Sequence, residues 1–216
     1  MNKFFGFLTE ETNEEKLTHL AHPGDHVIDA KGAGVAHAIN TLREVHKHLQ
    51  GKPSKAKIAT KYDGSPSIVF GHHPESGKFF VASKSAFNKN PKLNYTRGDI
   101  EKNHGHAPGL VEKLGQALKH LPKVTPKHGV YQGDVMQTHG DVKEHGDHVH
   151  ITPNTITYSA HKDSEQGKAM KRAKISVAVH TKYEGSSLEN MKAKFNHKPS
   201  DFGSHPDVHI IDTETK

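Results

Sequence analysis

A lysine two residues before an Asp-Gly pair is the clearest candidate for chemistry in this sequence. Lys61 ends one short apolar run, and Asp63-Gly64 begins a turn before the next apolar run at residues 67–71. Gly64 permits a close backbone approach, and Ser65 adds a hydroxyl. An amine beside such a turn suits attack on a phosphorus atom whose oxygens the turn holds. The same spacing occurs at ordinary strand-to-turn junctions, where Asp63 would be a turn-stabilising side chain.

Further predicted elements follow the Lys61 segment along the chain. A predicted hairpin over residues 67–83 leads to Lys84. Residues 129–136 predict a buried strand, and residues 175–180 predict an apolar strand. The first of these strands contains Tyr131 and is interrupted by Gly133 and Asp134. Tyr131 is interpreted either as a ring that stacks on a base or as a core aromatic residue.

In this order the segments resemble the covalent nucleotidyltransferases, namely ATP-dependent DNA ligases, RNA ligases and mRNA capping enzymes. There, the lysine of a Lys-x-Asp-Gly motif takes AMP or GMP as a lysyl phosphoramidate. The resemblance implies that Lys61 is the nucleophile and that ATP and Mg²⁺ are used. It implies nucleotide binding by Asp63, Gly64, Ser65, Lys84, Tyr131, Gly133 and Asp134, with Asp134 also at the metal. Pro66 departs from the pattern, because those families usually carry Arg or Asn at that position.

The chain also resembles a group of uncharacterised ligase-like proteins of tailed phages that infect marine cyanobacteria. The likeness is seen in residues 19–23, 61–92, 104–110 and 152–155, and it extends over nearly the whole chain. It implies a protein in the cytoplasm of an infected host cell, with DNA or RNA as the expected partner. Whether DNA, RNA or a protein accepts the nucleotide stays open, as does the choice between ATP and GTP.

Two late elements of the ligases are expected to lie beyond Lys216 or to be missing: a metal-binding Glu-Gly strand and a strand lysine that contacts phosphate. Glu184-Gly185 has the same two residue types as the first of these elements. However, Ser186-Ser187 before an amphipathic run is typical of helix capping, so Glu184-Gly185 is predicted to enter a helix. No lysine-bearing apolar strand is predicted after it. The chain is then either a fragment or a variant with half a catalytic site.

Composition narrows the class of protein. The 216 residues contain 30 Lys and Arg against 24 Asp and Glu, and the net charge of +6 suits phosphate-rich partners. The lack of cysteine excludes disulfides and thiolate metal sites and is typical of a reducing compartment. No apolar run approaches the length of a membrane span. We therefore expect an intracellular globular protein with no membrane partner.

The predicted fold class is α+β, with antiparallel sheets and flanking helices around a nucleotide cleft, as in a ligase adenylation domain. Residues 1–33 are expected to form an N-terminal arm and residues 34–216 the domain, possibly lacking its last strands. Apolar spacing predicts helices at residues 35–49, 110–121 and 187–195. Beyond the hairpin, strands are predicted at residues 129–136, 148–151, 155–158, 174–180 and 207–211.

The 21 histidines suggest a different function. His148 and His150 would share one face of a strand and could hold Zn²⁺ or Ni²⁺ with a neighbouring histidine or aspartate, although both could equally be surface residues. His104 and His106 precede a predicted helix and are interpreted as capping or pocket-lining residues. Two alternatives to a nucleotidyltransferase therefore stand: a non-catalytic nucleotide- or nucleic-acid-binding module, and a His-rich metal-binding phage structural protein.

Overall fold

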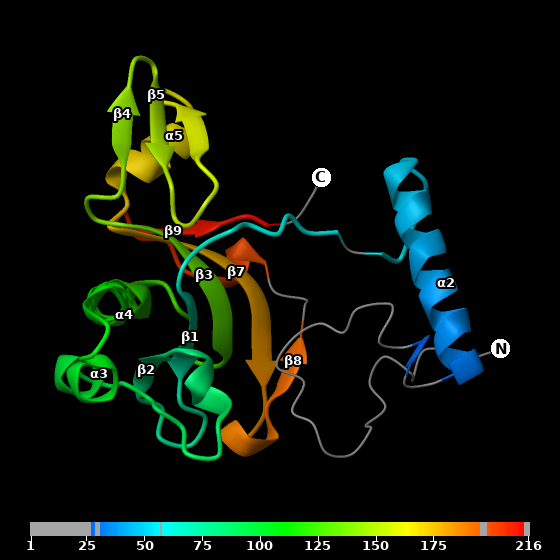
Figure 1. Cartoon of the computed structure of the whole chain (residues 1–216), viewed down its shortest axis with the longest axis horizontal. Coiled ribbons are helices and arrows are strands. Elements are labelled where there is room, and N and C mark those ends of the chain that lie inside the picture. The colour runs from blue at the N-terminus through cyan, green and yellow to red at the C-terminus, as the bar shows by residue number, and fades with distance from the viewer. Residues whose placement is uncertain (1–26, 29–30, 57, 195–197, 214–216) are drawn as a thin grey trace.

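The computed structural model describes residues 27–28, 31–56, 58–194 and 198–213, and its main feature is a six-stranded sheet (Figure 1). The strand order is β2-β1-β3-β7-β8, and β9 also pairs with β7. All pairs are antiparallel except β7 with β9. The strands are β1 (Ser67–His72), β2 (Phe79–Ala82), β3 (Val130–Thr138), β7 (Ile175–Glu184), β8 (Lys192–Lys194) and β9 (Val208–Ile211). The predicted α+β class with antiparallel sheets is confirmed.

A second, three-stranded antiparallel sheet lies beside helix α5 at one end of the main sheet (Figure 1). Its strands are β4 (Lys143–His145), β5 (His148–Ile151) and β6 (Tyr158–His161). The α-helices are α2 (Lys31–Leu49), α3 (Arg97–His104), α4 (Pro108–His120) and α5 (Glu165–Arg172). Short 3₁₀ turns are η2 (Lys84–Phe87), η3 (Leu121–Lys123), η4 (Leu188–Asn190) and η5 (Pro199–Asp201).

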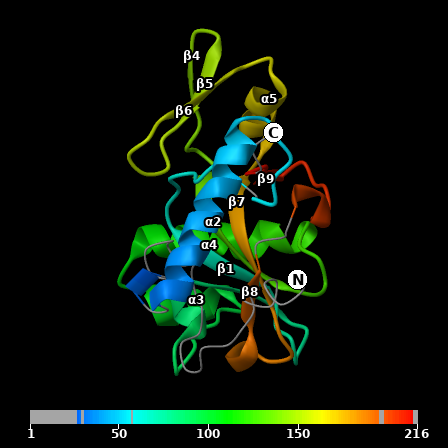
Figure 2. The ribbon, with the colours of Figure 1, turned by 90° about the vertical axis from the view of Figure 1, so that its right-hand side faces the viewer.

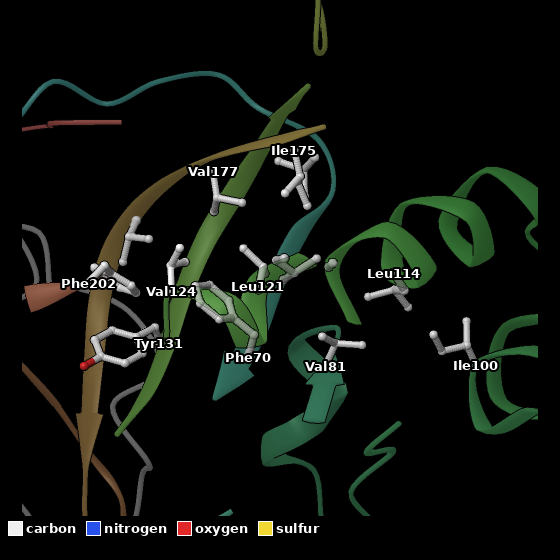
Figure 3. Close-up of a cluster of buried hydrophobic side chains, with 14 of the residues drawn as sticks. Phe70, Val81, Ile100, Leu114, Leu121, Val124, Tyr131, Ile175, Val177 and Phe202 are labelled. Carbon is white, nitrogen blue, oxygen red and sulfur yellow. The ribbon is translucent and has the colours of Figure 1, made fainter. Parts of the chain in front are cut away.

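Side-chain alternation along the strands divides the main sheet into two faces. The helix face buries Ile68 and Val135 together with Phe70, Val81, Tyr131 and Val177. The last four of these, with Ile100 of α3 and Leu114 of α4, which pack into the same cluster, are labelled in Figure 3. The opposite face carries Val69, Phe80, Ala82, Val130 and Tyr183, which pack against Leu188 and Met191. Most of the apolar core therefore lies on the helix face.

Helix α4 forms where its apolar spacing predicts it. Val111, Leu114 and Ala117 recur every three or four residues, so they share one side of the helix, and all three are buried in the main core. Pro108 occupies the first turn, where its missing N–H costs no helical hydrogen bond.

Helix α2 confirms the predicted helix at residues 35–49, but it begins at Lys31, inside the expected arm. Of the expected arm, residues 1–26 and 29–30 lie outside the described residues. Four large apolar side chains of α2 are exposed: Val35, Ile39, Leu42 and Leu49. The helix lies on the side of the main sheet away from α3 and α4, and it crosses in front of β1 and β7 in Figure 2. No helix among the described residues combines the length and apolarity needed to span a bilayer.

The predicted helix at residues 187–195 is wrong. Only η4 is helical there, and β8 follows it and pairs with the end of β7, with Glu184 opposite Lys192. A Cβ on Gly185 would lie 2.8 Å from the Cα of Met191, so this residue allows a tight reversal. Leu188 and Met191 bury themselves against Tyr183, and this packing outweighs the helical spacing.

Other boundaries also differ from the predictions. A lysine-bearing strand does follow Glu184, since β8 carries Lys192 and Lys194. Ala193 packs with the opposite-face cluster, so alternation places both lysines on the helix face. The strand expected at residues 155–158 forms at Tyr158–His161 instead. Helices α3 and α5 were not predicted, because each is only 8 residues long.

Gly133 should tolerate no side chain, which a Gly133→Ala variant would test. A Cβ at this position would lie 2.7 Å from the carbonyl oxygen of Ala178 and 2.9 Å from the Cα of Val179, both in β7. We expect urea unfolding to show a loss of about 1–3 kcal/mol, typical of overpacking. Gly109→Ala is the control, because Gly109 has open space in α4. It should be neutral or raise stability by up to about 1 kcal/mol. Equal stability of the two variants would contradict the close β3–β7 packing.

Candidate functional site

The segment that carries Lys61 is hydrogen-bonded at both ends, first to the chain after β9 and then to β3. Near its start, the Thr60 N–H donates to the carbonyl oxygen of Thr213 at 2.7 Å. At its end, the Ser65 N–H donates to the Val135 carbonyl, and the Val135 N–H donates to the Pro66 carbonyl, both at 3.0 Å. Lys61 therefore lies on a short length of chain between two fixed points.

The Asp63-Gly64 turn lies directly against β3. A Cβ on Gly64 would stand 2.7 Å from the Cβ of Asp134 and 2.8 Å from the Sδ of Met136. The strand register agrees, because Ser67 of β1 is paired with Asp134. Two of the predicted site segments, which are distant in sequence, are thus in contact.

Asp63 is an anchor for this turn. Its carboxylate accepts hydrogen bonds from Asn154 Nδ2 at 3.0 and 3.1 Å and from Thr155 Oγ1 at 3.0 Å, and its N–H donates to the Tyr158 hydroxyl at 2.8 Å. These hydrogen bonds, chiefly that from Asn154, lower the pKa of Asp63 below 3.8. The turn-stabilising interpretation of Asp63 therefore describes this structure, and its partners come from the β5–β6 loop.

A row of hydrogen-bonded polar side chains, here called the polar band, runs across the opposite face. The Tyr183 hydroxyl donates to Gln132 Oε1 at 2.6 Å, and Gln132 Nε2 donates to Ser67 Oγ at 3.1 Å. Burial raises the pKa of Tyr183 to about 12, so the phenol stays protonated and acts as a donor. Neither Gln132 nor Tyr183 was predicted as a site residue. The available signal was the strand period, which puts Gln132 on the same face as Asp134.

His180 lies close to Asp134, which is paired with Ser67 of the polar band. Gln132 pairs with Thr181 and Gly133 with Val179, so His180 is the extra residue of a β-bulge in β7. Its Nε2 lies 3.8 Å from Asp134 Oδ1, and its Nδ1 is 2.9 Å from the Thr181 hydroxyl. The side chains of Asp134 and His180 are 18% and 42% exposed, so both can be reached by a ligand.

The two predicted lysines are exposed and available. Lys61 and Lys84 are exposed, and neither ammonium forms a hydrogen bond or ion pair within the described part of the chain. Lys84 begins η2 directly after β2, the neighbour of β1. Lys113 is a third cation near the turn, and its Nζ donates to the Ser65 carbonyl at 2.6 Å. It lines a depression of about 260 Å³ with Ser65, Pro66, Gly109 and Leu110.

The remaining predicted strand residues have packing roles. Tyr131 is buried on the helix face, 4.7 Å from Phe202 and 6.0 Å from Phe70 between ring centroids, so the core interpretation applies to it. Gly133 pairs with Val179 of β7 and has no room for a side chain. Neither residue therefore offers a side chain to the surface that Asp134 and His180 share.

The histidine hairpin does not form the suggested metal site. The rings of His148 and His150 are 6.3 Å apart, and the described residues contain no group of three or more His, Asp or Glu side chains placed to hold a metal ion. His148 instead contacts His161 edge-on across the strand pair. His104 precedes α4, which begins at Pro108 as expected, but it is also the buried last residue of α3, and burial lowers its pKa.

Comparison with known proteins places the chain in a family. Residues 13–216 match the model of a family described as Family of unknown function (DUF6267). The chain belongs to this family. The match includes the Lys61 segment, β3, β7 and the second sheet, so every element of the candidate site lies within the family region. No curated protein and no solved structure matches the chain.

Removing the Asn154 amide should release the anchor on Asp63. In an Asn154→Ala variant, the carboxylate loses its largest stabilising contact, so its pKa should rise toward 3.8. Carbon NMR titration of the Asp63 carboxyl group would measure this change. Asp99 is the internal control, because its low pKa depends on Thr96 and Tyr95 and should not change.

The same lowered pKa sets a pH dependence. Because the folded pKa of Asp63 lies below its unfolded value, the anchor stabilises the fold above the unfolded pKa, and this contribution disappears as pH falls through the folded pKa. The stability difference between the wild type and Asn154→Ala should therefore be larger at pH 6 than at pH 2. A difference independent of pH would show that the anchor is not ionic.

Proposed function

We propose that this protein is an ATP-dependent nucleotidyltransferase of polynucleotide-ligase type, with Lys61 as the nucleophile. The proposal rests above all on the contact of the Asp63-Gly64 turn with Asp134, because the motif resemblance requires these two segments to meet. The polar band and the exposed Lys84 support it, since they add donors and charge on the neighbouring strands.

The proposed step is nucleophilic substitution at the α-phosphorus of ATP. The lone pair of the neutral Lys61 amine forms the P–N bond, while the bond from the α-phosphorus to the bridging oxygen breaks. Pyrophosphate leaves with that electron pair, and the amine proton passes to solvent. Lys84 and Lys113 would offset charge on the phosphate oxygens. The product is a lysyl-AMP, from which the AMP group can be transferred to a second substrate.

A magnesium ion would enter this site chiefly with the nucleotide. Mg²⁺ commonly uses one or two carboxylates, substrate phosphates and water, so a protein-only cage is not required. Asp134 fits that role as a single, partly exposed carboxylate. Its His180 partner would hold the carboxylate in place. Asp63 is less suited, because its oxygens already accept hydrogen bonds from Asn154 and Thr155.

A nucleic acid is proposed as the acceptor of the nucleotide. The net charge of +6 and the lysines beside the turn support a phosphate-rich partner. A protein acceptor would need no such excess of positive charge.

Intact mass measurement tests the nucleophile. Incubation with ATP, Mg²⁺ and pyrophosphatase should add one AMP to the wild type. Lys61→Ala should abolish the adduct, and so should Lys61→Arg, because guanidinium stays protonated. Lys52→Ala, in the exposed part of the same connecting segment, is the matched control and should keep the adduct.

The other outcomes select a different function. Nucleotide binding without an adduct would support a non-catalytic binding module. An adduct mapped to a lysine other than Lys61 would overturn the assignment. If the protein neither binds ATP or GTP nor forms an adduct with either, the proposal is overturned.

Asp134 can be tested separately from the nucleophile. If it holds the metal or ribose, Asp134→Asn should slow AMP transfer by about 10²-fold, a typical cost of losing one preorganised contact. Asp163→Asn is the control, because its side chain is 72% exposed in the turn between β6 and α5. A single-turnover rate with radiolabelled ATP would compare them. Equal rates would exclude Asp134 from the site.

A further inference from the structure

A groove with a basic lining lies between α5 and β9, away from the Lys61 segment. It has a volume of about 300 Å³, and its lining residues are Glu165, Gln166, Lys168, Ala169, Arg172 and His209. Five of these share one side of α5, because their spacing follows the helical repeat. His209 comes from β9, the outer strand beside β7. At roughly 30 Å³ for a water molecule, the groove has room for a small anion and its hydration.

The charges in the groove are mainly positive and largely uncompensated. The Arg172 guanidinium forms no hydrogen bond or ion pair within the described residues. Lys168 has one distant partner, Glu165 Oε1 at 3.9 Å, and the Glu165 side chain is 92% exposed. Such an exposed pair contributes little, so Lys168 stays available for another anion.

His209 of the groove lining belongs to a row of buried polar atoms without hydrogen-bond partners on adjacent strands. His209 is paired with Ser176, and Ser176 with Gln137, across three adjacent strands. His209 Nδ1, Ser176 Oγ and Gln137 Oε1 are all buried, and none has a hydrogen-bond partner among the described residues. Ser176 is fully buried and Gln137 is 1% exposed. Buried polar groups are rarely left unpaired, so three in one row indicate bound water or a ligand.

The three residues face the same side as α5. Ile175 and Val177 flank Ser176 and belong to the helix-face core, so alternation turns Ser176 to the opposite face. Gln137 Nε2 donates to the carbonyls of Met170 and Ala173 at the end of α5. The row and the groove therefore share one side of the main sheet.

We propose that the α5–β9 groove binds a phosphate group, with Arg172 and Lys168 as its charged ligands and His209 as a neutral donor. A guanidinium presents a planar fork of donors that matches phosphate oxygens, and Lys168 adds a point charge. Ser176 and Gln137 hold a water molecule behind the anion. A divalent cation is disfavoured here, because two permanent positive charges line the groove. This site is independent of the proposed nucleotidyltransferase chemistry.

Amide NMR titration with sodium phosphate, against sodium chloride at equal ionic strength, tests the site on the full chain. Phosphate should shift the amide signals of residues around His209 and Ser176 in the wild type. Arg172→Gln should weaken this binding at least tenfold. Lys171→Gln is the matched control, because Lys171 is next to Arg172 on α5 but pairs with Glu144 at 3.0 Å. It should bind phosphate like the wild type.

A single-stranded oligonucleotide, added in a second arm, identifies the source of the phosphate. If it shifts the same signals and competes with inorganic phosphate, the groove holds a nucleic-acid backbone; if only inorganic phosphate acts, the groove holds a free anion. Both outcomes support the site. The proposal is overturned if Arg172→Gln and Lys171→Gln bind alike, or if neither probe shifts signals at the groove. Loss of AMP transfer in Lys61→Ala would leave either result unchanged.

Discussion

Gly64 has room for a hydrogen atom and nothing larger where it meets β3. A Cβ there would come within 2.9 Å of the Val135 carbonyl oxygen and closer still to Asp134. This close approach lets the Ser65 N–H donate to the Val135 carbonyl and the Val135 N–H donate to the Pro66 carbonyl. Because the turn is held on β3, Lys61 and Asp134 belong to one region of the molecule. Any larger residue at position 64 would lift the turn and separate them.

The small β4–β6 sheet holds the Asp63-Gly64 turn in place. Its connecting loop supplies Asn154 and Thr155, which hold the Asp63 carboxylate. Tyr158 adds a hydrogen bond to the Asp63 backbone and a ring contact to Tyr62 at 5.6 Å. Hydrogen bonds to an ionised carboxylate are stronger than neutral ones, so this anchor fixes the turn more firmly than backbone pairing alone. The second sheet therefore supports the candidate nucleophile from a distance.

The two faces of the main sheet differ in their polar content. The helix face is filled by apolar side chains against α3 and α4. The opposite face buries a hydrogen-bonded phenol and amide, Tyr183 and Gln132, which leaves little desolvation penalty because both are paired. The exposed Asp134–His180 pair and the proposed phosphate groove lie on this same face.

The sequence by itself determined the α+β class, α4 and most strands, because apolar periodicity reports local burial directly. It also singled out Lys61 and Asp134 from their motifs. It could not find η4 and β8 after Glu184, since cross-strand pairing outweighs the helical spacing of Leu188 and Met191. It could not predict that Asp63 is hydrogen-bonded by Asn154 or that Gln132 is hydrogen-bonded by Tyr183. Nor could it predict that Arg172 and His209 line one groove. These contacts join residues distant along the chain, and only the register of the strands and the packing of the second sheet decide them.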